Sequence, residues 1–445
     1  MNKSVTVVGA GLAGCEAAYQ LLRRGVPVDL IEMRPVKQTP AHVTGSFAEL
    51  VCSNSLKAEH LTNASGLLKA EMKAIGSLIL DAAEGARVPA GGALAVDRQA
   101  FSDFITRTLE RHPLCHVERT VCEELPSEPC IIATGPLTDE ALSRAITRDL
   151  GVSGLHFFDA EAPILMADSI NMDRAFRASR YGRGDGDDYI NCPMTRDEYM
   201  AFYQALVTAE LADVHDFEKS MVFEGCLAVE ILASRGPMTL AFGPLKPVGL
   251  VDPHTGKQPF AVVQLRQDNA SGTLYNMVGF QTRLKWNEQK RVFGMIPGLE
   301  KAEFARYGVM HRNTYLDGPR LLQRNYALKD RPLIRFAGQM TGVEGYVESA
   351  ASGMVAAIGL YQSLNGVEET DFPSTTILGA LMRHTTTPTD DYQPMNSNFG
   401  LLQPLQDRPT GGKRVRYEKM SERSLEEINR LKDEVNRDVI MEAEK

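Results

Sequence analysis

Two cysteines are the residues of this chain best suited to covalent chemistry. Cys52 stands in "LVCSNSLKAE", among serines, an asparagine and a lysine, and Cys226 stands in "FEGCLAVE". A thiol attacks only as its thiolate, and a cysteine with an ordinary pKa of about 8.5 needs local help to reach that form. The polar neighbours of Cys52 favour ionisation, whereas "CLAVEIL" after Cys226 is apolar. For both cysteines the alternative is a half-buried structural role.

A glycine-rich turn near the N-terminus predicts a nucleotide site. In "SVTVVGAGLAGCEAAYQLLRRGVPVDLIE", residues 4–8 suit a buried strand, and Gly9, Gly11 and Gly14 form a turn before a helix. Glycine permits the tight turn, close approach of a pyrophosphate and helix packing, while the helix N-terminus supplies N–H groups. A second strand ends in Glu32, which can accept from ribose hydroxyls. Because all these parts occur in register, we expect a bound dinucleotide rather than an ordinary turn.

Two further segments favour FAD as that dinucleotide. "PCIIATGP" (129–136) is an apolar strand ending in Ala-Thr-Gly, a pattern common in flavoproteins with two dinucleotide folds. "LIRFAGQMTGVEGYVESAASG" (333–353) predicts a strand, a glycine-rich turn and a helix of small residues facing the ribityl–pyrophosphate part. The acid common in such proteins after Gly338 is Gln339 here. We therefore expect two ends of the chain to hold FAD.

Composition limits the class of protein. The chain has 445 residues, 43% of them hydrophobic, and a formal net charge of −9, which suggests two or three globular domains. The negative charge argues weakly against nucleic acid or an anionic membrane, so RNA would need a local basic patch. The seven cysteines lack CxxC pairs and metal-ligand spacing, and no apolar run is long enough to span a bilayer. We expect a cytoplasmic protein with reduced thiols, no metal and no membrane association.

Helical and strand patterns divide the chain into three parts. Residues 1–160 form the first part of an FAD-binding domain, 161–310 an inserted α+β domain, and 311–445 the second part with a tail and a C-terminal helix. Within the insert, 194–211 is predicted to be a helix and 179–194 a loop. Mostly antiparallel strands are predicted at 227–252, 259–268 and 273–284. After residue 365 a Pro/Thr-rich connection precedes the charged helix "SLEEINRLKDEVNRDVI" (424–440).

The sequence carries an ordered series of motifs over almost its whole length. They are "VVGAGLAG", "IEMRP", "FAELVCSNS", "RVPAGGALAVDR", "ATGPLT", "YINCPMT", "FEGCLAVE", "FGPLKPVGLVDP", "FAVVQLRQ", "VGFQT", "YGVMHRNTYL" and "GVEGYVESAASG". Together they resemble the folate- and FAD-dependent tRNA (uracil-5-)-methyltransferases, the TrmFO family. The resemblance implies an α/β fold with a Rossmann-type, GidA-like FAD-binding domain and an inserted α+β domain.

The resemblance also implies the reaction. It is methylation at C5 of the T-loop uridine at tRNA position 54, giving ribothymidine. The carbon comes from 5,10-methylenetetrahydrofolate, reducing equivalents come from NAD(P)H, and the flavin relays the one-carbon unit and a hydride. Uracil C5 becomes nucleophilic once a thiolate adds at C6. We expect Cys226 to add at C6 and Cys52 to handle the C5 proton or the methylene, with the opposite assignment open.

The remaining site residues follow from the same motifs. The expected FAD contacts are Gly9, Ala10, Gly11, Leu12, Ala13, Gly14, Glu32, Met33, Arg34, Arg98, Ala133, Thr134, Gly135, Gly338, Gln339, Gly345 and Tyr346. Tyr346 is placed to stack on the isoalloxazine or, equally, to pack at a helix start. Folate is expected near "HRNTYL", where His311, Arg312 and Asn313 could instead form a hydrogen-bonded turn.

Two basic segments are candidates for RNA contact. "GGKRVRYEK" (411–419) contains Lys413, Arg414, Arg416 and Lys419, although a solvated charge run is an equal alternative. The second candidate is Arg283 with Lys285, near Trp286. No obligate protein partner is predicted.

Four other functions compete with this hypothesis. A related flavoprotein acting at the wobble uridine with a partner protein has a longer helical C-terminal region. The same reaction on ribosomal RNA is compatible with the sequence. A flavin thiol–disulfide reductase needs two cysteines close in sequence, which Cys52 lacks, and a non-catalytic RNA-binding module leaves the flavin motifs unexplained.

Overall fold

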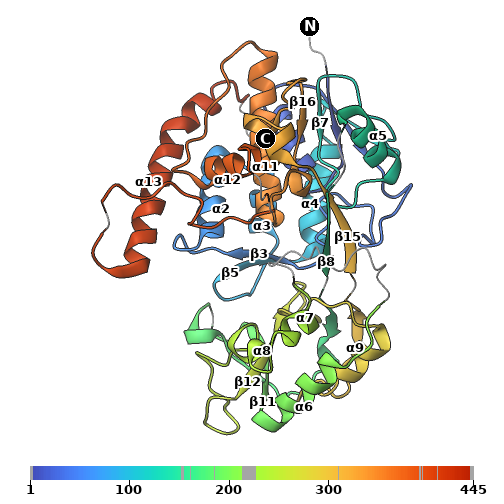
Figure 1. The fold of residues 1–445 in the computed structure, drawn as a ribbon, viewed down its shortest axis with the longest axis vertical. Helices are drawn as coiled ribbons and strands as arrows, with labels where there is room; N and C mark the ends of the chain where they lie inside the picture. The colour runs from blue at the N-terminus through green and yellow to red at the C-terminus, as the bar shows by residue number, and fades with distance from the viewer. Residues whose placement is uncertain are drawn as a thin grey trace.

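The computed structural model contains two bodies joined at a narrow waist (Figure 1). It describes residues 4–151, 155–160, 162–184, 186–212, 227–308, 310–389, 392, 394–407 and 409–440, with the backbone alone at 155–160 and 310–314. Each body has its own hydrophobic core. No described helix combines the length and apolar character that a membrane span requires.

The larger body is built on a parallel five-stranded sheet in the order β16-β7-β1-β2-β6. Its strands are β1 (Val5–Val8), β2 (Val28–Glu32), β6 (Cys115–Arg119), β7 (Cys130–Ile132) and β16 (Ile334–Phe336). A parallel sheet must be covered on both faces, which accounts for its almost wholly buried central strands. Strand β16 comes from the far end of the chain, so both ends build this sheet. The predicted Rossmann-type core is confirmed.

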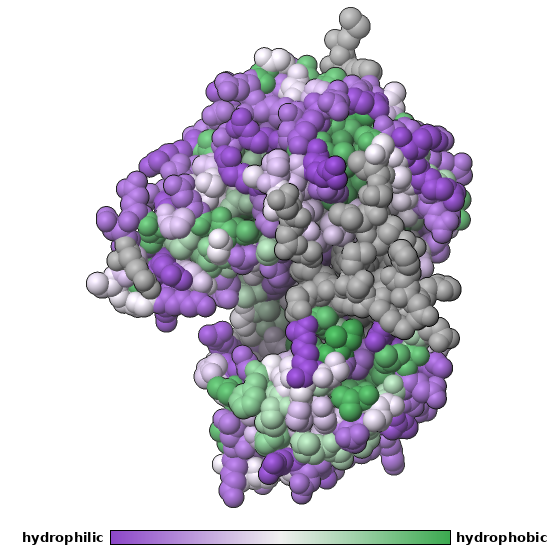
Figure 2. All heavy atoms as spheres, in the orientation of Figure 1, coloured by the Kyte–Doolittle hydropathy of each residue, from purple (hydrophilic) through white to green (hydrophobic). Residues whose placement is uncertain are grey.

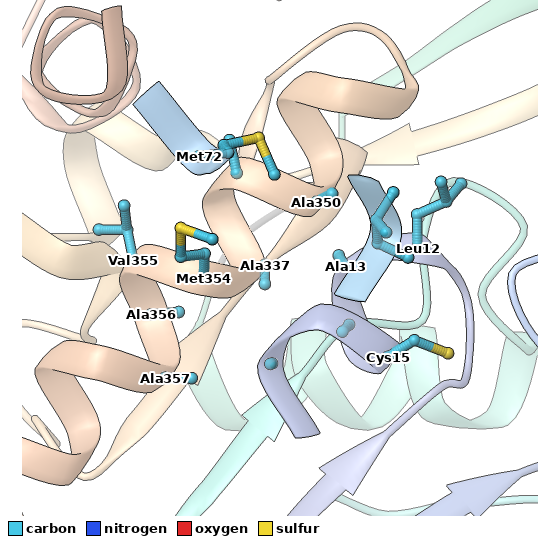
Figure 3. Close-up of a cluster of buried hydrophobic side chains, with 14 of the residues drawn as sticks. Leu12, Ala13, Cys15, Met72, Ala337, Ala350, Met354, Val355, Ala356 and Ala357 are labelled. Atoms are coloured by element: carbon cyan, nitrogen blue, oxygen red, sulfur yellow. The ribbon is translucent and has the colours of Figure 1, made fainter. Parts of the chain in front are cut away.

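Two helices with small side chains cross at the centre of this body. Helices α1 (Leu12–Leu22) and α11 (Tyr346–Leu364) approach so closely that a Cβ on Gly353 would lie 2.1 Å from the Ala13 carbonyl oxygen. Figure 3 shows small and apolar side chains around this contact, among them Ala13 and Cys15 of α1, Ala350 and Met354 of α11, and Met72 of α2. The Cys15 thiol is buried and lies 3.2 Å from the Ala10 carbonyl oxygen, in keeping with a packing role. This packing brings the N-termini of both helices to one edge of the sheet.

The remaining elements of the larger body surround this core. A three-stranded sheet on its underside is formed by β3 (Ser55–Ala58), β5 (Ala93–Val96) and β4 (Arg87–Val88). The other helices are α2 (Ala64–Ile75), α3 (Leu78–Gly85), α4 (Arg98–Glu110), α5 (Glu140–Leu150), α10 (Gly318–Leu321), α12 (Ile377–Thr386) and α13 (Gly412–Val435).

The smaller body is an antiparallel sheet in the order β10-β11-β12-β13-β9-β14 with helices packed on it. Its strands are β9 (Ile164–Met166), β10 (Phe176–Arg177), β11 (Tyr189–Met194), β12 (Ala261–Gln267), β13 (Leu274–Met277) and β14 (Phe304–Arg306). Its helices are α6 (Arg196–Val207), α7 (Val229–Ser234), α8 (Thr239–Phe242) and α9 (Trp286–Phe293). An antiparallel ribbon of β8 (Leu155–Ala160) and β15 (Met310–Tyr315) flanks it in sequence. The predicted inserted α+β fold is confirmed.

Several local predictions were wrong. The segment 227–252 was expected to be strands, but it contains the short helices α7 and α8, whose one or two turns are too brief to show a helical period. Strand β11 occupies part of the predicted loop 179–194, and α12 lies inside the Pro/Thr-rich connection. Helix α13 begins at Gly412, twelve residues before the predicted start, so the basic segment 411–419 is helical.

Candidate active site

A large cavity opens at the carboxyl edge of the parallel sheet, between the N-termini of α1 and α11. Its empty space, part of it open to solvent, amounts to about 1030 Å³. This is where an open α/β sheet binds its ligand, because strand ends and helix N-termini converge there. Thirteen of the predicted FAD contacts line it, namely Gly9, Gly11, Leu12, Ala13, Glu32, Met33, Arg34, Ala133, Thr134, Gly135, Gly338, Gln339 and Tyr346.

The three glycines of the turn have different physical roles. A Cβ on Gly11 would meet nothing within 4 Å, so this backbone faces the open cavity. Gly9 has a φ of +96°, and a Cβ there would lie 2.7 Å from the Ala133 carbonyl oxygen. A Cβ on Gly14 would lie 1.8 Å from the Gly9 carbonyl oxygen, so only glycine lets the helix pack on the turn. Gly11 is thus the position reserved for a ligand.

Glu32 lies at the end of β2 in a network of hydrogen bonds. One carboxylate oxygen accepts from the Ala10 N–H at 2.7 Å, and the other accepts from the Arg34 Nε at 2.8 Å. Burial by itself would raise the pKa of Glu32, but the Arg34 charge and these hydrogen bonds outweigh it and hold the pKa below its ordinary value. The charged acid is therefore fixed at the position where a dinucleotide presents its ribose.

Cys52 and Tyr346 meet at the edge of the cavity. The Tyr346 hydroxyl oxygen accepts from the N–H groups of Cys52 at 2.9 Å and Ser53 at 3.3 Å, and it lies 3.0 Å from the Cys52 Sγ. Burial, followed by the neighbouring Cys52, raises the pKa of Tyr346 well above its ordinary value. The phenol therefore stays protonated, beside the thiol and at the first residue of α11.

The smaller body supports the segment that carries Cys52. Arg98 of the larger body forms a bidentate ion pair with Asp268, with N···O distances of 3.0 and 3.1 Å. It also donates to the carbonyl oxygens of Leu50 and Val51. Arg266 on β12 donates to the Ser53 Oγ at 2.7 Å and to the Asn54 Oδ1 at 3.0 Å. Residues 50–54 are thus held from both sides of the waist.

Four predicted FAD contacts do not line the cavity. The Ala10 N–H binds Glu32, Gly14 packs against the turn, and Arg98 faces Asp268. A Cβ on Gly345 would lie 2.3 Å from a carboxylate oxygen of Glu348. Cys226 lies outside the described residues, as do the side chains of the folate candidates His311, Arg312 and Asn313. Among the described residues no cluster suited to a metal ion is present.

Sequence reasoning missed several lining residues on loops. Thr120, Val121 and Cys122 follow β6, and the rule that strand ends converge could have found them. His42 and Glu49 come from the long loop after β2, where no periodic pattern points to them. Burial and the Arg34 charge lower the pKa of His42 to about 4, so its imidazole is neutral at pH 7.

The cavity fits a dinucleotide by its donors and shape. Unobstructed glycine backbone, two helix N-termini and a fixed carboxylate suit a pyrophosphate and a ribose. The aromatic ring of Tyr346, which also lines the cavity, suits a flat ring system such as a flavin. The residues present are therefore those that FAD requires.

Comparisons with known proteins agree with this fold. A family model described as Glucose inhibited division protein A matches residues 4–368. The solved structure of Aquifex aeolicus GidA superposes with a TM-score of 0.72 at 14% identity, covering 99% of this chain and 74% of that one. The confirmed class is therefore a GidA-like α/β protein with an FAD-binding fold.

Closer relatives narrow the class. A Listeria monocytogenes protein is 57% identical over 439 residues, covering 98% of this chain and 100% of the relative. A Desulforudis audaxviator protein is 59% identical over 432 residues, covering 97% of each. Both are named methylenetetrahydrofolate--tRNA-(uracil-5-)-methyltransferase TrmFO. The chain belongs to the TrmFO family.

Proposed function

We propose that this chain methylates C5 of a uridine in tRNA, with FAD as its bound cofactor and 5,10-methylenetetrahydrofolate as carbon donor. The observation that carries the proposal is the contact between Cys52 and Tyr346 at the edge of the dinucleotide cavity. The relatives that are 57% and 59% identical are named for this reaction. In more detail, we propose that the target is uridine 54 of the T-loop, that NAD(P)H is the reductant and that the protein acts in the cytoplasm.

Gly11, Glu32 and Tyr346 would hold the cofactor. The unobstructed backbone of Gly11 would admit the pyrophosphate, Glu32 would accept from the ribose, and Tyr346 would face the flavin ring system. Once reduced by NAD(P)H, bound FAD would supply the two electrons that bring a carbon at the oxidation level of formaldehyde to a methyl group.

The two thiols divide the work on the pyrimidine. One thiolate adds to C6, which makes C5 nucleophilic, and a base must later remove the C5 proton before the C6–S bond breaks. We propose that Cys226 is the nucleophile and that Cys52 serves the C5 side, next to the Tyr346 hydroxyl. When Cys52 is ionised its sulfur can only accept, so the phenol donates to it and stabilises the thiolate.

Trapping the covalent adduct tests the proposal. RNA with 5-fluorouridine at the target has no C5 proton to lose, so the thiol stays attached and peptide mapping identifies it. We expect attachment at Cys226. Cys52→Ala and Cys226→Ala should each abolish methylation while FAD content stays full. Attachment at Cys52 would reverse the roles, and attachment at neither cysteine would refute the thiol mechanism.

A further inference from the structure

A second, larger recess lies between the two bodies, on the side of the waist away from the dinucleotide cavity. It contains about 1450 Å³ of open space, and Figure 2 shows the surface hollowed at this waist. Its walls come from residues 58–63 and the turn 91–93 of the larger body, from the segment 179–184 with Tyr189 and Gln264 of the smaller body, and from the start of α13. We call it the waist groove.

Three arginines line the waist groove, two on the wall formed by the smaller body and one at the start of α13. Arg180 and Arg183 belong to the smaller body, and Arg414 comes from the first turn of α13. Neither Arg180 nor Arg183 forms an ion pair within the part of the chain that the structure describes. Arg414 pairs with Glu418 at 2.9 Å, but this i,i+4 pair is exposed and worth only a few tenths of a kcal/mol, about 0.3–0.5. An anion can therefore replace Glu418 at little cost.

Arg180 is the deepest of the three cations. Its Nε donates to the Gln264 Oε1 at 2.8 Å and its Nη1 to the Val248 carbonyl oxygen at 2.8 Å. These neutral acceptors orient the guanidinium but leave its charge uncompensated. Burial consequently lowers the pKa of Arg180, against the smaller opposing effects of Tyr181 and Tyr189. The nearby acid Asp188 is occupied by the Gly91 N–H and the Ser179 hydroxyl.

The waist groove leads toward Cys52. Gln264, which holds Arg180, and Arg266, which holds Ser53, are two residues apart on β12 and therefore lie on the same face of that strand. Arg180 and the residue next to Cys52 are thus connected along one row of side chains. Two residues of a β-strand span roughly 7 Å. An RNA strand bound at Arg180 would therefore have to extend only about that far to reach the segment that carries Cys52.

The other basic candidate has no such free charge. Lys285 pairs with Glu210 at 3.0 Å, and Arg283 lies 3.8 Å from Glu230. Trp286 is stacked on Tyr307 with the ring centroids 5.4 Å apart. Both cations of this patch face carboxylates, whereas Arg180 and Arg183 pair with no acid among the described residues, which favours the waist groove as the site for an anionic polymer.

We propose that the waist groove binds the phosphate backbone of the tRNA and delivers the target uridine to Cys52. This inference rests on the proposed function and adds its RNA-binding surface. In this proposal Arg180, Arg183 and Arg414 contact phosphates from opposite walls of the groove. Because the chain has a net charge of −9, its binding of a polyanion must depend on such a local cluster of cations. Tyr181, 68% exposed and within 6.0 Å of the Arg183 guanidinium, offers a ring on which an unpaired base stacks.

Binding of unmodified tRNA to the FAD-loaded protein tests the groove. Arg183→Ala and Arg414→Ala should each weaken the affinity about three- to tenfold, and a triple variant with Arg180→Ala about a hundredfold. The slope of log affinity against log salt should become shallower by about one for each arginine removed. Arg144→Ala is the matched control, because Arg144 is exposed on α5 and pairs with Glu140 at i,i+4, as Arg414 does with Glu418.

The outcomes separate the groove from the reaction. If the triple variant binds tRNA with unchanged affinity and slope while wild-type protein methylates it, the groove proposal is refuted and the proposed function stands. If wild-type protein does not methylate tRNA, the proposed function fails. If the variants instead raise the KM for 5,10-methylenetetrahydrofolate with tRNA affinity unchanged, the groove is a folate site. Full flavin absorbance in every variant confirms that the fold is intact.

Discussion

The hydroxyl of Tyr346 should control how readily Cys52 ionises, and Tyr346→Phe removes that group alone. The oxygen already accepts two N–H groups, from Cys52 and Ser53, so its single proton is available for the sulfur 3.0 Å away. The phenylalanine ring keeps its place at the start of α11, so the surface facing the cofactor is retained. The substitution therefore removes the one side-chain donor to the sulfur, together with the acceptor of the Cys52 and Ser53 N–H groups.

The size of the effect follows from that geometry. A hydrogen bond to a charged group contributes about 1.5–3 kcal/mol, and sulfur as acceptor places this one near the lower end. One pH unit corresponds to about 1.36 kcal/mol. Because the variant loses a donor to the thiolate, the midpoint of Cys52 reactivity should move up by about one pH unit. Below the midpoint, the rate should fall about tenfold.

Alkylation by iodoacetamide, followed by peptide mapping, measures the rate at Cys52 separately from the other cysteines. Cys15, Cys130 and Cys192 should contribute little alkylation, because burial raises the pKa values of their thiols and keeps them protonated. Tyr199→Phe is the control, since that hydroxyl donates to the Pro237 carbonyl oxygen at 2.7 Å in the smaller body. An unchanged or lower midpoint in Tyr346→Phe, with the control unchanged, would show that the phenol does not stabilise the thiolate.

Three further substitutions test other parts of the site. Gly11→Val should fold normally yet lose FAD, because its side chain enters open space; a full flavin spectrum would contradict this. Asp268→Ala should lower the free energy of unfolding by about 3 kcal/mol, since it leaves Arg98 unpaired, and urea unfolding measures it. Burial raises the pKa of Glu71 from 4.5 to about 7, so the stability it contributes is present at low pH and lost as pH rises from 4.5 through 7. The contribution of Glu71 to the unfolding free energy should drop on the order of 3 kcal/mol over that window, and Glu71→Gln should remove this contribution while leaving that of Glu16, whose pKa burial also raises to about 7.

The turn around Gly11 and the contacts of Arg98 show what a sequence can and cannot reveal about such a site. The turn at Gly9, Gly11 and Gly14 could be predicted because its steric requirements are local. The pairing of Arg98 with Asp268 could not, because it joins residues 170 apart and depends on how two bodies meet. Arg98 was expected at the cofactor, whereas its contacts place it behind residues 50 and 51, where it orients the Cys52 segment.

The short helices of the smaller body mark a different limit. Helices α7 and α8 span six and four residues, so a hydrophobic period of 3.6 cannot be recognised in them. The glycines and prolines that follow them, Gly236-Pro237 and Gly243-Pro244, are equally typical of turns between strands. The same ambiguity concealed α12 within a Pro/Thr-rich segment, where the Thr376 side chain caps the helix by accepting from the Gly379 N–H.

Helix α13 shows how a local departure from the usual rules indicates function. Its first turn carries Lys413 and Arg414 and no acid, although the positive end of the helix dipole disfavours cations by about 0.3–1 kcal/mol each. A surface helix selected for stability alone would place Asp or Glu there. Arg414 also lines the waist groove. An anion bound there would interact favourably with both the helix N-terminus and the arginine side chains, and this would offset the penalty. The unfavourable charge is therefore best explained by the RNA that the groove is proposed to bind.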